Sequence, residues 1–134
     1  MGRVNAALLL LALLAVPIRV PAACLVHLNE HVVLYGTSDD PDVLLWDSRF
    51  RLRLYEGGTF DQMQALLPHA ILVRPGTRAM VQSCVPNFVQ SKFAQTPDDA
   101  VGIVVTQGPL RGKRGWVIGS AIRVMQAMRG RRYR

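Results

Sequence analysis

The chain has 134 residues and a formal net charge of +7, from 16 basic and 9 acidic side chains. Arg3 and Arg19 lie in the leading segment and four arginines lie in residues 124–134, so the body between them (23–123) carries a net charge near +1. The high overall charge therefore does not make that body a strongly basic, charge-driven binder of nucleic acid or lipid.

The first 22 residues have the three parts of a secretory signal peptide. Arg3 supplies positive charge, Ala6–Val16 is an unbroken apolar run of 11 residues, and Val20 and Ala22 are the small residues that precede a cleavage site. A membrane span needs about 20 apolar residues, and Arg19 closes this run. The pattern predicts cleavage after Ala22 and a protein that works outside the cytoplasm, in the periplasm or beyond the cell.

Cleavage would leave 112 residues, the size of one domain with one core. Cys24 and Cys84 remain, and an oxidising compartment favours a disulfide between them. Closing that loop of about 60 residues would stabilise the fold by roughly 4 kcal/mol in the chain-entropy model. The alternative is that Ala22-Ala23-Cys24 ends a bacterial lipoprotein signal, so that an acylated Cys24 anchors the protein to a membrane. The two alternatives exclude each other.

His31–Tyr35 and Val43–Trp46 are predicted strands, because they are short and rich in apolar or β-branched residues. The Gly, Asp and Pro residues of 36–42 favour a chain reversal between them. The aspartates of this turn lack the ligand spacing of a calcium loop, and His27 and His31 have no third ligand nearby. We therefore predict no metal and no cofactor.

Arg49–Tyr55 has the clearest periodicity in the chain. Phe50, Leu52 and Leu54 alternate with three arginines, which predicts a strand with one face on the core and one in water. A helix would be expected to bring arginines into the core, and we assign Phe50 and Trp46 to that core. The three guanidinium groups could bind a carboxylate-rich or phosphate-rich ligand. We favour instead salt bridges to the aspartates that precede them, Asp39, Asp40, Asp42 and Asp47.

Thr59 and Gln62 are spaced as a capping box, which predicts a short helix over Asp61–Leu67. Ala70–Val73 and Arg78–Ser83 are predicted strands. The Pro and Gly between them favour a tight turn, so we expect these two strands to pair as a hairpin.

Residues 85–99 are predicted to form an irregular loop, because Pro, Asn and Asp interrupt the apolar pattern. Long loops in small domains are often functional. If Cys84 acted there as a nucleophile with His69 as base, the protein would be a small exported enzyme or inhibitor. The chain has no Gly-x-Ser-x-Gly, phosphate-loop or paired-carboxylate motif, so we predict no catalytic residues.

Val101–Thr106 and Trp116–Ile118 are predicted strands joined by a glycine-rich turn over 108–115, and Ala121–Met128 is either a strand or a short helix. Five to seven short strands at this spacing indicate a small barrel or sandwich.

Residues 101–123 resemble the end of a bacterial Src-homology-3-like domain, in which a Gly- and Lys-rich turn leads into Gly-Trp-Val and the tryptophan packs across the barrel mouth. The Pro75-Gly76-Thr77 turn is similar to an earlier hairpin of that family, whereas the family's opening Asn-Val-Arg stretch is missing. The residues that carry the resemblance are Val104, Val105, Gly108-Pro109-Leu110, Gly112-Lys113, Gly115-Trp116-Val117 and Ile122.

The resemblance implies a non-catalytic binding module whose partner is a cell-wall polymer, a peptide or an envelope protein. The same turn resembles the KOW element of ribosomal and transcription proteins, which contacts RNA, but the predicted export argues against a nucleic-acid partner. We expect a signal peptide (1–22), one mostly β Src-homology-3-like barrel with an N-terminal β extension (23–123) and a basic tail (124–134). The predicted ligand groove is lined by Trp116, Arg111, Lys113 and Tyr55.

Overall fold

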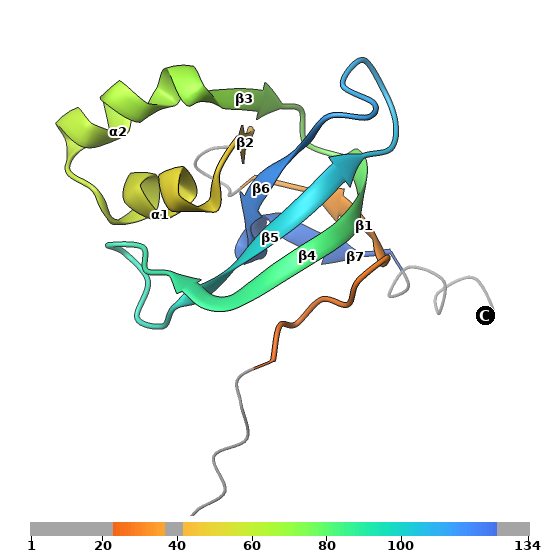
Figure 1. Ribbon diagram of the computed structural model, residues 1–134, viewed down its shortest axis with the longest axis horizontal. Helices are drawn as coiled ribbons and strands as arrows, with labels where there is room; N and C mark the ends of the chain where they lie inside the picture. The colour runs from red at the N-terminus through yellow and green to blue at the C-terminus, as the bar shows by residue number, and fades with distance from the viewer. Residues whose placement is uncertain (1–22, 37–41, 126–134) are drawn as a thin grey trace, which may run out of the picture.

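The computed structural model describes residues 23–36 and 42–125 (Figure 1). The predicted signal peptide, Asp39, Asp40 and residues 126–134 of the predicted tail lie outside the described residues. Within the described part, no helix is long and apolar enough to cross a membrane. The elements in chain order are β1 (His31–Leu34), β2 (Val43–Trp46), α1 (Arg49–Gly57), α2 (Phe60–Leu66), the 3-10 turn η2 (Leu67–His69), β3 (Ala70–Val73), β4 (Thr77–Val89), β5 (Asp98–Val105), β6 (Arg114–Ile118), the 3-10 turn η3 (Gly119–Ala121) and β7 (Ile122–Val124).

The seven strands form one antiparallel sheet in the order β3-β2-β6-β5-β4-β1-β7. The sheet curls into half a barrel, as Figure 1 shows, because the long strand β4 pairs with β1 near its start and with β5 along most of its length. Register shifts between Val81 and Ser83 and between Val85 and Val89 are bulges that help to bend β4. The prediction of a mostly β chain is confirmed.

Two hydrophobic cores lie on opposite faces of this sheet, because successive side chains of a strand point to opposite sides. Val43 and Leu45 of β2 belong to the larger core on the concave side, to which the other strands also contribute. Trp46 belongs to a smaller core on the outer face, which α1 covers with Leu52. Trp46 and Leu52 are each only 1% exposed, so the assignment of Trp46 to the core is confirmed.

Arg49–Tyr55 forms helix α1, so the prediction of a strand there is wrong. Ser48 caps the helix by accepting a hydrogen bond from the backbone N–H of Phe50, and Arg and Leu are good helix formers. The helix buries a narrow stripe centred on Leu52, which leaves the arginines outside the core. Phe50, expected in the core, is 56% exposed.

The predicted loop over 85–99 is shorter in the structure: β4 runs to Val89 and β5 begins at Asp98, so residues 90–97 form the connection between them. Pro86 and Asn87 lie in the second bulge of β4, where a residue without an N–H and a residue with a positive φ of 51° are tolerated. Pro86 and Asn87 therefore mark an irregularity inside a strand, whereas Pro97 belongs to the connection between β4 and β5.

The predicted hairpin over 70–83 is also wrong, because β3 pairs with β2 whereas β4 pairs with β1 and β5. The turn itself is present, with Gly76 at a φ of +85° and its N–H donating to the carbonyl of Leu34. The helix after Thr59 is confirmed together with its capping box, and so are the strands on either side of the 108–115 turn. Residues 122–124 of the ambiguous segment form strand β7.

Candidate functional site

The structure does not gather the four residues of the predicted groove at one place. Trp116 on β6 and Tyr55 on α1 both pack against the outer core, but the Tyr55 ring lies 4.9 Å from that of Trp46. Arg111 and Lys113 are exposed in the turn between β5 and β6, which projects at the upper right of Figure 1 while α1 lies at the left. Of the four predicted residues, Trp116 is the one that lies next to a cluster of arginine and aromatic side chains.

Arginine and aromatic side chains meet around Trp116 on the outer face of the molecule. The Cζ atom of Arg49 lies 5.2 Å from the ring centre of Phe50, 5.6 Å from that of Phe88 and 5.8 Å from that of Trp116. The Cζ atom of Arg53 lies 5.0 Å from the ring centre of Phe88. We call these five residues the arginine–aromatic surface.

Three elements bring these residues together. Arg49 and Arg53 are one helical turn apart on α1, so both reach Phe88 in the bulged part of β4. Phe50 meets Phe88 edge to face, with 5.6 Å between ring centres. Trp116 comes from β6, which lies directly beside β5 in the sheet.

Trp116 sits beside Gly102, its partner across the β5–β6 ladder. A Cβ placed on Gly102 would lie 2.2 Å from the hydroxyl oxygen of Ser83 and in ordinary contact with the indole, at 3.4 Å from its Cη2 atom. The indole thus packs on Gly102 of β5, with the Cζ atom of Arg49 5.8 Å from its ring centre.

The charge of this surface is not balanced by the described part of the chain. Arg51 forms an ion pair with Asp47. This is one of the salt bridges to the preceding aspartates that we favoured from the sequence. Arg49 and Arg53 form no ion pair with a residue that the structure describes, and like charges at this helical spacing repel each other. Their guanidinium carbons lie 5.0–5.8 Å from the centres of aromatic rings, and guanidinium N–H groups bind carboxylates and other oxyanions.

An open depression of about 630 Å³ adjoins the arginine–aromatic surface. Phe50, Arg53 and Leu54 line it from α1, and Gln62 and Gln90 line it from α2 and from the residue after β4. Leu54 is 59% exposed, so the depression offers apolar contact beside the guanidinium groups. The sequence pointed to the arginines of Arg49–Tyr55 and to Trp116 as ligand-binding candidates, but it did not bring them together with Phe88, because the segment was expected to be a strand.

A second cavity, of about 390 Å³, is lined by other residues of α1. Tyr55 and Glu56 contribute to its wall, and Trp46, Leu52 and Ile118 contribute apolar surface. Burial raises the pKa of the Glu56 carboxyl, and the negative charge of Asp98 adds to that effect.

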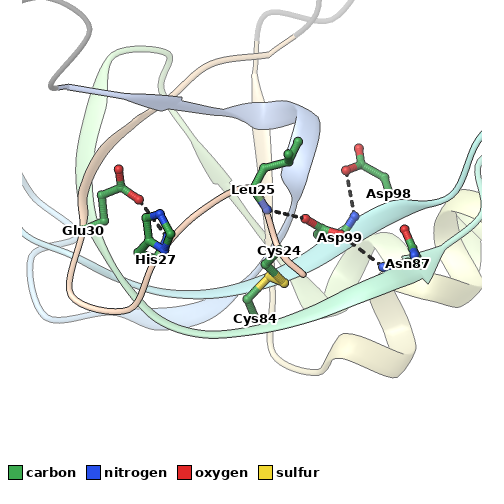
Figure 2. The surroundings of a disulfide bond; sticks show 8 residues. All are labelled: Cys24, Leu25, His27, Glu30, Cys84, Asn87, Asp98 and Asp99. Atoms are coloured by element: carbon green, nitrogen blue, oxygen red, sulfur yellow. Dashed lines mark hydrogen bonds between the residues drawn. A yellow bond between two sulfur atoms is a disulfide. The ribbon is translucent and has the colours of Figure 1, made fainter. Parts of the chain in front are cut away.

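The predicted disulfide is present: Cys24 and Cys84 are bonded, with 6.4 Å between their Cα atoms (Figure 2). The buried carboxylate of Asp99 lies beside it and accepts hydrogen bonds from the backbone N–H groups of Leu25 and Asn87, at 3.3 and 3.1 Å. The two sulfur atoms of Cys24 and Cys84 and a carboxylate oxygen of Asp99 lie within 4.8 Å of one another. The sulfurs are bonded to each other, however, so they offer no thiolate to a metal. The bridge also excludes the acylation of Cys24 and the nucleophilic thiol considered for Cys84.

Comparison with known proteins gives no relative: no family model, no curated protein and no solved structure matches this chain.

Proposed function

We propose that this chain is an exported, non-catalytic binding module of the Src-homology-3-like kind, working in a bacterial envelope, and that its partner docks on the arginine–aromatic surface. The observation that carries the proposal is the guanidinium of Arg49 within 6 Å of three aromatic rings, next to a second unpaired guanidinium among the described residues. The disulfide is consistent with an oxidising location.

The partner that this chemistry favours is an acidic peptide segment of another envelope protein. Arginine forks bind carboxylates through paired N–H groups, and aromatic residues and arginine are the commonest anchors of protein interfaces. Phe50 and Leu54 would contact the apolar side chains of such a segment. A nucleic-acid partner is disfavoured by the near-neutral body, in which positive and negative charges almost balance.

The alternative of an exported enzyme or inhibitor has lost two features on which it depended. Residues 85–89 and 98–99 belong to strands, and the sulfur of Cys84 is held in the disulfide. Residues 90–97 still connect β4 with β5, and a peptide-binding assay separates the two functions.

The test is a titration of the isotope-labelled protein with a short peptide of alternating Glu and Leu, followed by backbone and indole NMR signals. We expect saturable shifts at Arg49, Phe88 and Trp116, and about tenfold weaker binding when Arg49 and Arg53 are both changed to Gln, because each loses a charge-assisted hydrogen bond. Arg78→Gln, an exposed arginine of β4, is the matched control and should bind normally.

Equal affinity for a peptide with Gln in place of Glu would contradict the proposal, as would equal losses in the control variant. Binding of a cell-wall polysaccharide or a single-stranded oligonucleotide in place of the peptide would assign the surface to another class of partner.

A further inference from the structure

We propose that the cavity of about 390 Å³ beneath the C-terminal half of α1 is a second binding site, which takes a small organic cation: a primary ammonium group on an apolar body. Its volume falls within the roughly 300–1,000 Å³ of small-molecule sites. The site shares no residue with the arginine–aromatic surface, so the inference does not depend on the function proposed above.

The floor of the cavity is apolar. Trp46 and Leu52 are each 1% exposed, and Ile118 of β6 packs against the same outer core. A hydrocarbon chain would leave water by contact with the half-buried Leu44 and Ile118, which line the cavity in front of these two covered side chains. Each methylene group buried in this way would strengthen binding.

The charge of the lining selects the ligand. Asp42 and Glu56 line the cavity, and Asp98 of β5 is close enough to act on Glu56, whereas Lys92 is the cation that the described lining contributes. No hydrogen bond or ion pair joins the Glu56 carboxyl to another described residue. An anionic ligand would be repelled by these carboxyls, and a neutral one would leave the cost of burying Glu56 in place. A cation offsets that cost, because it favours the ionised form of a partly buried acid.

Aromatic side chains at the rim fit the same ligand. Tyr35 and Tyr55 line the cavity, and the guanidinium of Arg123 already lies 4.5 Å from the ring centre of Tyr35. Because this contact already places a cation on the Tyr35 ring, the attraction for the ligand comes from the carboxyls of Asp42 and Glu56.

The experiment is an NMR titration of the oxidised protein with hexylammonium, compared with hexanol and hexanoate. We expect saturable shifts at Glu56, Ser91 and Ser120, and binding of hexanol and hexanoate at least about tenfold weaker, which corresponds to roughly 1.4 kcal/mol. Glu56→Gln should weaken hexylammonium binding about tenfold, and Asp61→Asn, an exposed acid on α2, should leave it unchanged.

Glu56→Asp keeps the charge and should retain part of the affinity, which separates the loss of the carboxylate from a loss of packing. Thermal unfolding of each variant checks that the fold is intact. The proposal is overturned if hexanol binds as tightly as hexylammonium, if Glu56→Gln binds normally, if the shifts fall on Arg49 and Phe88, or if the titration does not saturate.

Discussion

At the residue scale, Glu56 shows how a single side chain is placed by tertiary packing. It lies near the end of α1, where burial raises the pKa of its carboxyl above the usual value of 4.5 and the charge of Asp98 raises it further. The folded protein therefore holds the Glu56 proton more tightly than the unfolded chain does, and this difference links stability to pH.

We expect the free energy of unfolding of the wild-type protein to fall, relative to that of Glu56→Gln, as the pH rises above 4.5. Below that pH the carboxyl is protonated in both states and contributes no difference, whereas above it ionisation is more costly in the folded state. Urea denaturation of both proteins across this range measures the effect, with Asp61→Asn as control. A difference that stays constant with pH would show that Glu56 ionises as freely in the fold as in the unfolded chain.

Individual residues were predictable from the sequence where chemistry alone decides their role. The bond between Cys24 and Cys84 was expected from the cysteine count and the predicted export, with an acylated Cys24 as the alternative, and Trp46 is buried as expected. Phe50 and Glu56 were not predictable, because their exposure depends on which face of α1 meets the sheet. The surroundings of Trp116 likewise depend on side chains from α1 and β4.

At the scale of elements, α1 shows where periodicity fails as a guide. Over seven residues, strict alternation of apolar and charged side chains matches a strand, but the helix needs few buried positions and its cap lies outside the alternating run, at Ser48. The capping signal was recognised at Thr59, where a reciprocal Gln follows, and that helix was predicted correctly. Over a short stretch of sequence, capping residues predict a helix more reliably than the periodicity of apolar residues does.

The close approach of the paired strands β2 and β6 depends on Gly115. A Cβ on this residue would lie 2.6 Å from Leu45 Cγ and 2.7 Å from the carbonyl oxygen of Trp46, so one of the strands would have to move. We expect Gly115→Ala to lower the free energy of unfolding by about 3 kcal/mol, at the upper end of the usual cost of overpacking. Denaturation with urea measures the loss.

Gly112→Ala is the matched control for that substitution. Gly112 has a φ of +85° but no atom within 4 Å of a Cβ built there, so its replacement should cost only about 1 kcal/mol of backbone strain. Equal losses in the two variants would mean that β2 and β6 adjust to the added methyl group and that their close approach is not a constraint.

At the scale of the whole molecule, the class of the fold was predictable and its topology was not. Strand-forming segments and turns can be located locally, and most of them lie where the sequence places them. The partners of those strands are set by contacts between distant segments: β1 pairs with both β4 and β7, and β3 joins β2 across the helices. A hairpin between β3 and β4 was expected because Pro75 and Gly76 form a tight turn between them, but that turn leads the chain to different partner strands.

The disulfide ties the start of the described chain to the middle of this sheet. Its cysteines are 60 positions apart in the sequence, and β1, β2, β3, α1 and α2 lie between them. We expect replacement of Cys24 and Cys84 by serine to lower the free energy of unfolding by about 4 kcal/mol, because the unfolded chain regains the entropy of an open loop of this length. Urea denaturation of the oxidised protein and of the double variant measures the difference.

Asp99→Asn separates the effect of the bridge from that of the hydrogen bonds beside it. This variant leaves the disulfide intact and weakens the interactions with the N–H groups of Leu25 and Asn87, so we expect a loss of about 1 kcal/mol. If Asp99→Asn cost as much as the double serine variant, the hydrogen bonds would be the principal attachment of the N-terminal segment. If neither variant changed the unfolding free energy, the residues before β1 would contribute nothing to the stability of the sheet.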